Sequence, residues 1–143
     1  MIELLIVVAI ILIIAAIAIP NLVKSKMAAN EASAVGATRT ITTSELTYAS
    51  IYPATGYTAL NNLYSAGFVD SLLGSGSKSG YSYSLATSGG TPATAFTTNA
   101  NPITHGTTGT NYYCSDQTGV IQRGSSAFGT STNPCSGGTP IGQ

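Results

Sequence analysis

Residues 1–19 read MIELLIVVAIILIIAAIAI, and this stretch decides the fold because it is uninterrupted hydrocarbon apart from Glu3. A helix of this length covers about 28 Å, which just spans the apolar core of a bilayer. A secretory signal peptide is one alternative, but it would have a basic start and a shorter apolar run. A buried core helix is a second, although no other segment is apolar enough to cover the stretch all round.

The rest of the chain has a different composition. Hydrophobic residues make up 43% of the 143 residues, yet they crowd into the first two dozen positions, and Ser, Thr, Gly, Asn and Tyr dominate afterwards. Charged residues make up 7%, with five basic and five acidic side chains and a formal net charge of 0. Phosphate binding requires several local cations, so we expect no specific binding of nucleic acid.

Glu3 is the one charge inside the apolar stretch. A carboxylate at the centre of a bilayer costs on the order of 2 to 3 kcal/mol, and less near the interface, so such residues usually face a partner. A side chain that reaches the headgroups is the alternative. Depth alone leaves both interpretations open.

Pro20 follows the apolar run and either stops the helix or kinks it. Residues 21–52 are rich in alanine and repeat apolar residues at spacings of three, four or seven, which favours a kinked continuation. Pro53 and Gly56 then end it, so we expect one helix of roughly 78 Å over residues 1–52.

The second half of this helix carries an apolar stripe for a head domain, although Glu31 and Glu45 lie close to the stripe and blur it. The predicted organisation has three parts: an apolar half of the helix at 1–22, an amphipathic half at 23–52 and a globular head at 53–143. The stripe consists of Met27, Ala34, Ala37, Ile41, Tyr48 and Ile51.

Residues 2–22, IELLIVVAIILIIAAIAIPNL, resemble the N-terminal segment of type IV pilins and of the related type II secretion pseudopilins. The resemblance combines Glu3, a solid apolar run and a Pro-Asn-Leu exit. It implies a prepilin peptidase that removes a short basic leader and leaves an N-methylated residue, usually Phe. Family members usually have two residues more before the glutamate, so we expect this chain to lack the leader and the modified residue. Many members also have a glycine where Leu12 stands, at a position of local helix loss in filaments.

The resemblance also implies a role for Glu3, which would pair with the N-terminal amine of a neighbouring subunit in a filament core. A carboxylate in an apolar bundle needs an opposite charge or a proton, so this role is physically sound. The apolar half would first anchor the subunit in the inner membrane and later pack against identical subunits. Lys24 and Lys26 favour the cytoplasmic side, whereas the family topology places them outside; a basic leader resolves this conflict.

The head from Pro53 onward has 91 residues, a size at which one core is marginal and a covalent tie helps. Residues 54–80 predict a short helix or two in a connecting loop. Four strand-like runs follow, at Tyr81–Ala86, Ala93–Asn99, Thr110–Asp116 and Gly119–Arg123. The expected fold is α+β, with a small antiparallel sheet of about four strands packed on the second half of the long helix.

The two cysteines offer the covalent tie. Residues 124–143 are rich in Ser, Gly and Thr and have little capacity to bury a core. A bridge between Cys114 and Cys135 would close a loop of about 20 residues, a stabilisation of roughly 3 kcal/mol where the compartment is oxidising. Two free buried thiols are the alternative for a cytosolic chain. The bridge also matches the C-terminal cysteine loop of many pilins.

Catalytic chemistry is not evident in the sequence. His105 is the one histidine, and its loop offers no further metal ligand. The glycine-rich residues 74–80, GSGSKSG, lack the order of a phosphate loop and predict a flexible loop. We therefore expect no enzyme, cofactor or metal site. The Ser/Thr-rich surface suggests O-linked sugars by composition alone.

The leading hypothesis is a structural subunit of a type IV pilus, first in the inner membrane and then in an extracellular filament. Its expected partners are identical subunits, the membrane, the prepilin peptidase and the pilus assembly machinery. One alternative is a type II secretion pseudopilin, and another is a membrane-anchored module whose Tyr-bearing head binds a ligand. Adhesion, motility, DNA uptake and electron transfer are conceivable roles, but no residue spacing requires any of them.

Overall fold

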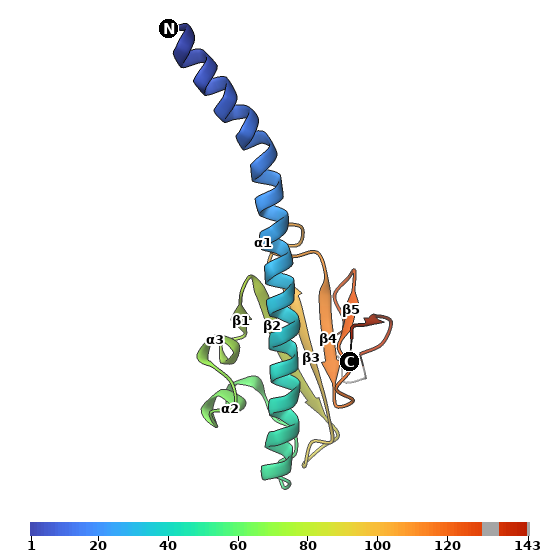
Figure 1. Cartoon of the computed structure of the whole chain (residues 1–143). Coiled ribbons are helices and arrows are strands. Elements are labelled where there is room, and N and C mark those ends of the chain that lie inside the picture. The colour runs from blue at the N-terminus through green and yellow to red at the C-terminus, as the bar shows by residue number, and fades with distance from the viewer. Residues whose placement is uncertain (130–134, 143) are drawn as a thin grey trace.

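The computed structural model describes residues 1–129 and 135–142. Its longest element is α1, Ile2–Ile51, a helix of 50 residues and about 75 Å. The predicted single long helix is confirmed. It runs through Pro20, and Figure 1 shows its blue N-terminal part leaning away from the axis of the remainder. The helix ends where the N–H of Tyr52 donates to the carbonyl of Tyr48 and Pro53 follows without an N–H.

The head contains an antiparallel sheet, which confirms the predicted α+β class. Within the described residues it has six strands in the order β1-β2-β3-β4-β5-β6, so each strand pairs with the next along the chain. Two short helices, α2 and α3, precede the sheet and lie beside α1 (Figure 1). The bounds are α2 Leu60–Ser65, α3 Ser71–Gly74, β1 Ser77–Lys78, β2 Tyr81–Ser88, β3 Ala95–Pro102, β4 Tyr112–Asp116, β5 Gln122–Gly124 and β6 Thr139–Pro140.

The second half of α1 covers one face of the sheet. On β2, Tyr81 and Tyr83 are buried while Ser82 and Ser84 are exposed, which is the alternation that the sequence predicted. These tyrosines pack in one core with small residues of the helix, so the backbone of α1 can come close to the strands. The core comprises Ala34, Ala37, Ile41, Leu60, Leu63, Val69, Leu73, Tyr81, Tyr83, Ala100, Tyr113 and Ile121.

On the opposite face of the sheet, the C-terminal tail packs against β3 and β4. Successive side chains of a strand point to opposite faces, so Cys114 faces away from α1 when Tyr113 faces it. Cys114 forms a disulfide with Cys135, with 5.8 Å between the two Cα atoms. β3 and β4 are therefore buried on both faces, which explains why Thr97, Asn99 and Asp116 are buried polar residues.

The strand boundaries differ from the expectation in several places. The fourth run was expected at 119–123, but Asp116 and Gly119 form a turn there, with the N–H of Gly119 donating to the carbonyl of Asp116 at 3.0 Å, and β5 starts at Gln122. Residues 74–80, expected as a flexible loop, contain β1, which pairs with β2. β6 was also unexpected. Its short Ser/Gly-rich segment has no strand pattern of its own and is ordered by pairing with β5.

Of the predicted apolar stripe, Ala34, Ala37 and Ile41 are buried, Met27 and Tyr48 are half-buried, and Ile51 is exposed. Ile51 stands in the last turn of α1 and is 56% exposed. The buried positions of the helix instead include Thr38, Thr42, Ser44 and Glu45. Threonine and serine can bury there because their hydroxyls donate to helix carbonyls or to a loop; for example, Thr38 Oγ1 donates to the carbonyl of Ala34 at 2.9 Å.

Candidate functional site

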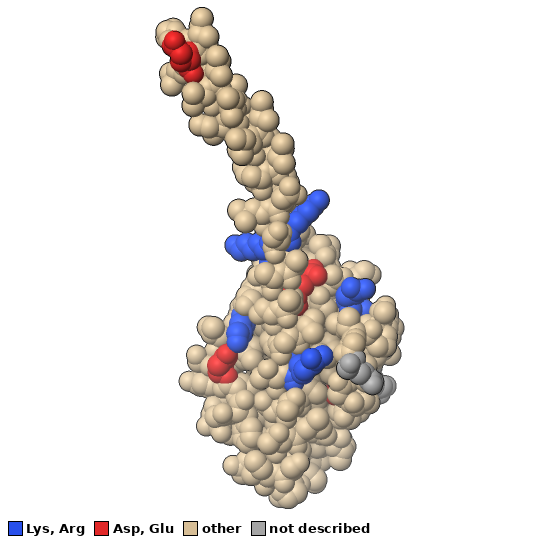
Figure 2. Space-filling view, viewed as in Figure 1, with Lys and Arg blue, Asp and Glu red and all other residues tan. Residues whose placement is uncertain are grey.

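The apolar half of α1, residues 1–22, projects beyond the head with no partner among the described residues. An 18-residue window of the helix is long and apolar enough to cross a membrane, and none of it is buried. Figure 2 shows this half as an uncharged shaft apart from its tip. Water is a poor solvent for such a surface, so lipid or other protein must cover it.

Glu3 lies in the first turn of α1, and Figure 2 shows an acidic group at the tip of the shaft. Its side chain is 95% exposed, and its carboxylate is 3.5 Å from the N-terminal amine of Met1. Both partners of that ion pair are exposed, so the pair adds little stability to the isolated chain. The structure thus leaves the carboxylate of Glu3 available to a group outside the chain.

Basic side chains mark the other end of the apolar half. Lys24 and Lys26 are both exposed, and Figure 2 shows basic groups projecting to both sides of the helix at its junction with the head. In the described part of the chain, the ion pairs are Met1 with Glu3 and Lys78 with Asp70. Neither lysine therefore forms an ion pair with a carboxylate among the described residues.

Glu31 attaches the long helix to the start of β4, a role that the sequence did not reveal. Its carboxylate accepts from the N–H and hydroxyl of Thr110 at 2.8 and 2.9 Å, and from the N–H and side-chain amide of Asn111 at 3.2 and 2.8 Å. The hydroxyl of Tyr113 donates at 3.4 Å. Burial raises the pKa of Glu31, but these hydrogen bonds outweigh burial and leave that pKa below its ordinary value.

Glu45 is the second acid whose place was missed. It is 0% exposed, and its Oε2 accepts from the N–H of Thr58 at 3.0 Å. Within the described residues, Oε1 has no hydrogen-bond partner. Burial raises the pKa of Glu45 to about 7, against the opposing effect of the Thr58 N–H. Glu45 therefore joins α1 to the loop before α2. Its carboxyl group is poorly solvated there, which opposes ionisation.

The tail is held by polar contacts as well as by the disulfide. The carboxylate of Asp116 accepts from the N–H of Cys135 at 3.1 Å, and the side-chain amide of Asn99 donates to the carbonyl of Gly129 at 3.3 Å. Gln122 donates to the carbonyl of Cys135 and accepts from the N–H of Gly138 at 3.1 Å. These contacts attach a segment with few apolar side chains to the outer face of the sheet.

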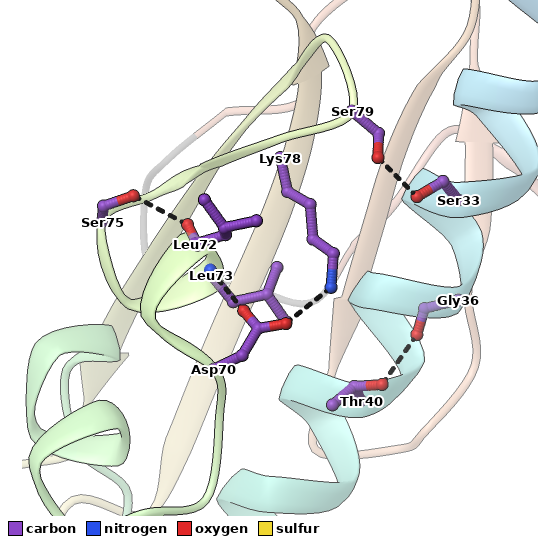
Figure 3. Close-up of polar contacts among 9 residues, drawn as sticks. All are labelled: Ser33, Gly36, Thr40, Asp70, Leu72, Leu73, Ser75, Lys78 and Ser79. Carbon is purple, nitrogen blue, oxygen red and sulfur yellow. Dashed lines mark hydrogen bonds and ion pairs between the residues drawn. The ribbon is translucent and has the colours of Figure 1, made fainter.

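A groove of about 680 Å³ runs between α1 and the segment that contains α3 (Figure 3). The α1 wall is built of Ser33, Gly36, Ala37 and Thr40, and the opposite wall of Gly67, Phe68, Val69, Asp70, Leu73 and Lys78. Asp70 accepts from Lys78 at 2.7 Å and from the N–H of Leu73 at 2.8 Å, which lowers its pKa. Ser33 donates to Ser79 at 3.0 Å beside the groove.

The α1 wall of this groove projects little at Gly36, because glycine has no side chain. A Cβ placed on Gly36 would meet no atom within 4 Å, and Gly36 is exposed. Thr40 donates its hydroxyl to the carbonyl of Gly36 at 3.0 Å, so its polar atom turns back onto the helix and its methyl group remains for packing. The groove is therefore shallow on its α1 side, where the side chains are small, and its opposite wall is a mixture of apolar and polar side chains.

The remaining residues singled out in the sequence do not converge. His105 stacks on Tyr112 with 5.8 Å between the ring centroids, and Lys78 of the glycine-rich segment binds Asp70. In the ranges 1–129 and 135–142, no group of three or more His, Cys, Asp or Glu side chains could hold a metal ion.

The arrangement is pilin-like in shape: a long apolar N-terminal helix carries a small antiparallel sheet and a disulfide-bonded tail. Comparisons of the chain with models of protein families, with curated proteins and with solved structures found no match.

Proposed function

We propose that this chain is the structural subunit of a type IV pilus and polymerises through the apolar half of α1 into an extracellular helical filament. The observation that carries the proposal is that no residue of the apolar 18-residue window is buried, although the head beside it is well packed. A shaft of this kind needs a hydrophobic environment, and identical shafts provide it when they pack side by side. The subunit would lie in the inner membrane before assembly.

The distribution of polar groups supports assembly over a plain membrane anchor. A plain anchor needs no acid in its apolar segment, where a carboxylate is costly. Glu3 is held by no group of the head, which leaves it free to pair with a cation of a neighbouring subunit. The disulfide and the polar contacts of the tail suit a head that works outside the cell, where no reducing pool maintains free thiols.

The proposed role is structural and requires no catalysis. Its partners would be copies of the same chain, the membrane, a prepilin peptidase and a pilus assembly machinery. The test is production of the chain, with a basic leader, in a bacterium that has such a machinery but lacks its own pilin. Sheared surface fibres should contain the chain by peptide mass spectrometry. Recovery from the envelope alone, together with restored protein secretion, would favour a pseudopilin instead.

A further inference from the structure

The groove between α1 and the α3 segment is open in the isolated chain. Another part of the same chain has side chains complementary to this groove. Gly36 and Thr40 are the exposed residues of its helix wall and Ser33 is half-buried beside them, at spacings of three and four that keep all three on one face. Val69 and Leu73 line the facing wall and are themselves packed in the core. A helix that binds in this groove should present large apolar side chains at the same spacings of three and four residues.

The apolar half of α1 presents such side chains. Ile10, Ile13 and Ile17 repeat the spacings of Ser33, Gly36 and Thr40, and each lies 23 positions before its counterpart. All three isoleucines are more than half exposed. A second copy displaced by 23 residues, about 35 Å along the helix, would place each isoleucine level with one of the small residues. Large side chains against small ones allow two helices to approach closely.

The same displacement brings opposite charges to one level. Lys26 also lies 23 positions after Glu3. Glu3 precedes the three isoleucines by seven, ten and fourteen positions, and Lys26 precedes the three small residues of the groove by the same numbers. Glu3 therefore lies on the isoleucine face of one helix, and Lys26 on the groove face of the other. Lys24 differs, because nine residues at 100° each place it on the opposite side of α1 from Ser33. Charge and shape thus select one stagger.

We propose that the groove receives the apolar half of a second copy's α1, staggered by 23 residues, with Glu3 of that copy paired to Lys26. This inference rests on the proposed filament function and specifies the register within it. It assigns the acid of the shaft to a side chain on the helix of a neighbouring subunit. The Asp70–Lys78 pair also lines the groove, and Lys78 does not compete for Glu3 because it already binds Asp70 at 2.7 Å.

Cysteine cross-linking tests the stagger. The chain with Ile17→Cys and Thr40→Cys should yield linked subunits in sheared filaments on non-reducing gels, because the two positions would lie level. The matched control is Ile17→Cys with Thr47→Cys, since Thr47 is exposed and lies on the same face as Thr40 but two turns later. The native disulfide joins residues of one chain and does not alter the ladder. Filaments that link through Thr47 but not Thr40 would overturn the stagger and leave the filament function intact.

Charge exchange tests the ion pair. Glu3→Lys and Lys26→Glu should each lower the filament yield at least tenfold, and the combined exchange should restore most of it. The matched control combines Glu3→Lys with Lys24→Glu and should restore none. A combined Glu3/Lys26 variant no better than its worse single variant would overturn the pair. A wild-type chain that never forms filaments would overturn both this inference and the proposed function.

Discussion

The carboxylate of Glu31 accepts both the backbone N–H and the hydroxyl of Thr110, 79 positions later in the chain. This contact attaches α1 to the turn before β4, just beyond the junction of shaft and head. Force or motion transmitted along the helix would therefore reach the sheet through a charged, well-satisfied contact rather than through apolar packing alone.

Glu31→Ala should lower the free energy of unfolding of the head by about 1.5 to 3 kcal/mol, the usual size for hydrogen bonds to a charged group. Asp70→Asn is the control: it removes an exposed ion pair but keeps an acceptor for the N–H of Leu73, so its cost should stay below about 1 kcal/mol. Denaturant unfolding in detergent, followed through the near-ultraviolet circular dichroism of the tyrosines, measures both. Equal losses for the two variants would contradict the role given to Glu31.

Glu45 predicts a pH dependence of opposite sign to that of an ordinary salt-bridged acid. Its pKa is raised by burial from 4.5 to about 7, so the folded head binds the proton more tightly than the unfolded chain. The stability associated with this proton is complete below pH 4.5 and is lost as the pH rises to about 7. The total loss should be about 3 kcal/mol.

Glu45→Gln isolates this effect because glutamine stays neutral. The variant should match the wild type near pH 4.5 and exceed it in unfolding free energy at pH 8. Denaturant titrations of both proteins across that range provide the comparison. A difference that does not change with pH would mean that Glu45 keeps its ordinary pKa.

Replacement of Cys114 and Cys135 by serine should cost about 3 kcal/mol, the entropy of leaving a loop of this length open in the unfolded chain. The tail has little apolar surface of its own, so it should also become cleavable by protease beyond β5 while the head up to residue 124 stays protected. Limited proteolysis with mass spectrometry, with and without reductant, detects this. Protection of the tail in the serine variant would show that Asn99, Asp116 and Gln122 suffice to hold it.

Substitutions of Gly36 test the stability of the fold and the proposed assembly independently. Because a Cβ at Gly36 has open space, Gly36→Ala should stabilise α1 by roughly 0.5 to 1 kcal/mol. Gly36→Leu should leave the head equally folded but fill the groove, so filament yield should fall in the leucine variant and not in the alanine variant. Normal yield with leucine would mean that the groove stays empty in filaments.

Glu3→Ala should leave insertion into the membrane unharmed and impair assembly, since the helix is long and apolar enough to span a bilayer without the acid. Fractionation of membranes and quantification of sheared filaments measure the two steps separately. A wild-type filament yield from this variant would remove any role for an ion pair at Glu3.

The elements with strong periodicity could be predicted from the sequence. The apolar run, the alanine-rich continuation and the Tyr81–Leu85 alternation each specify one structure through local pattern, and Cys114 and Cys135 lie together in the fold. β1 and β6 were missed because pairing with neighbouring strands, rather than local propensity, orders such short segments.

The roles of the buried acids were not predictable for a different reason. Glu31 and Glu45 looked like irregularities in an apolar stripe, whereas each binds backbone N–H groups from another part of the chain. Backbone donors leave no mark in a sequence, so their partners become visible only when the fold brings the segments together. The groove depends likewise on the distance between α1 and the α3 segment.

A reconstruction of filaments at side-chain resolution tests most directly whether the shaft exists to pack against copies of itself. We expect the apolar halves of α1 at the filament centre, with the heads and their disulfide-bonded tails outside. Subunits found singly in the membrane, with residues 1–22 surrounded by lipid and no filament under any condition of export, would contradict it.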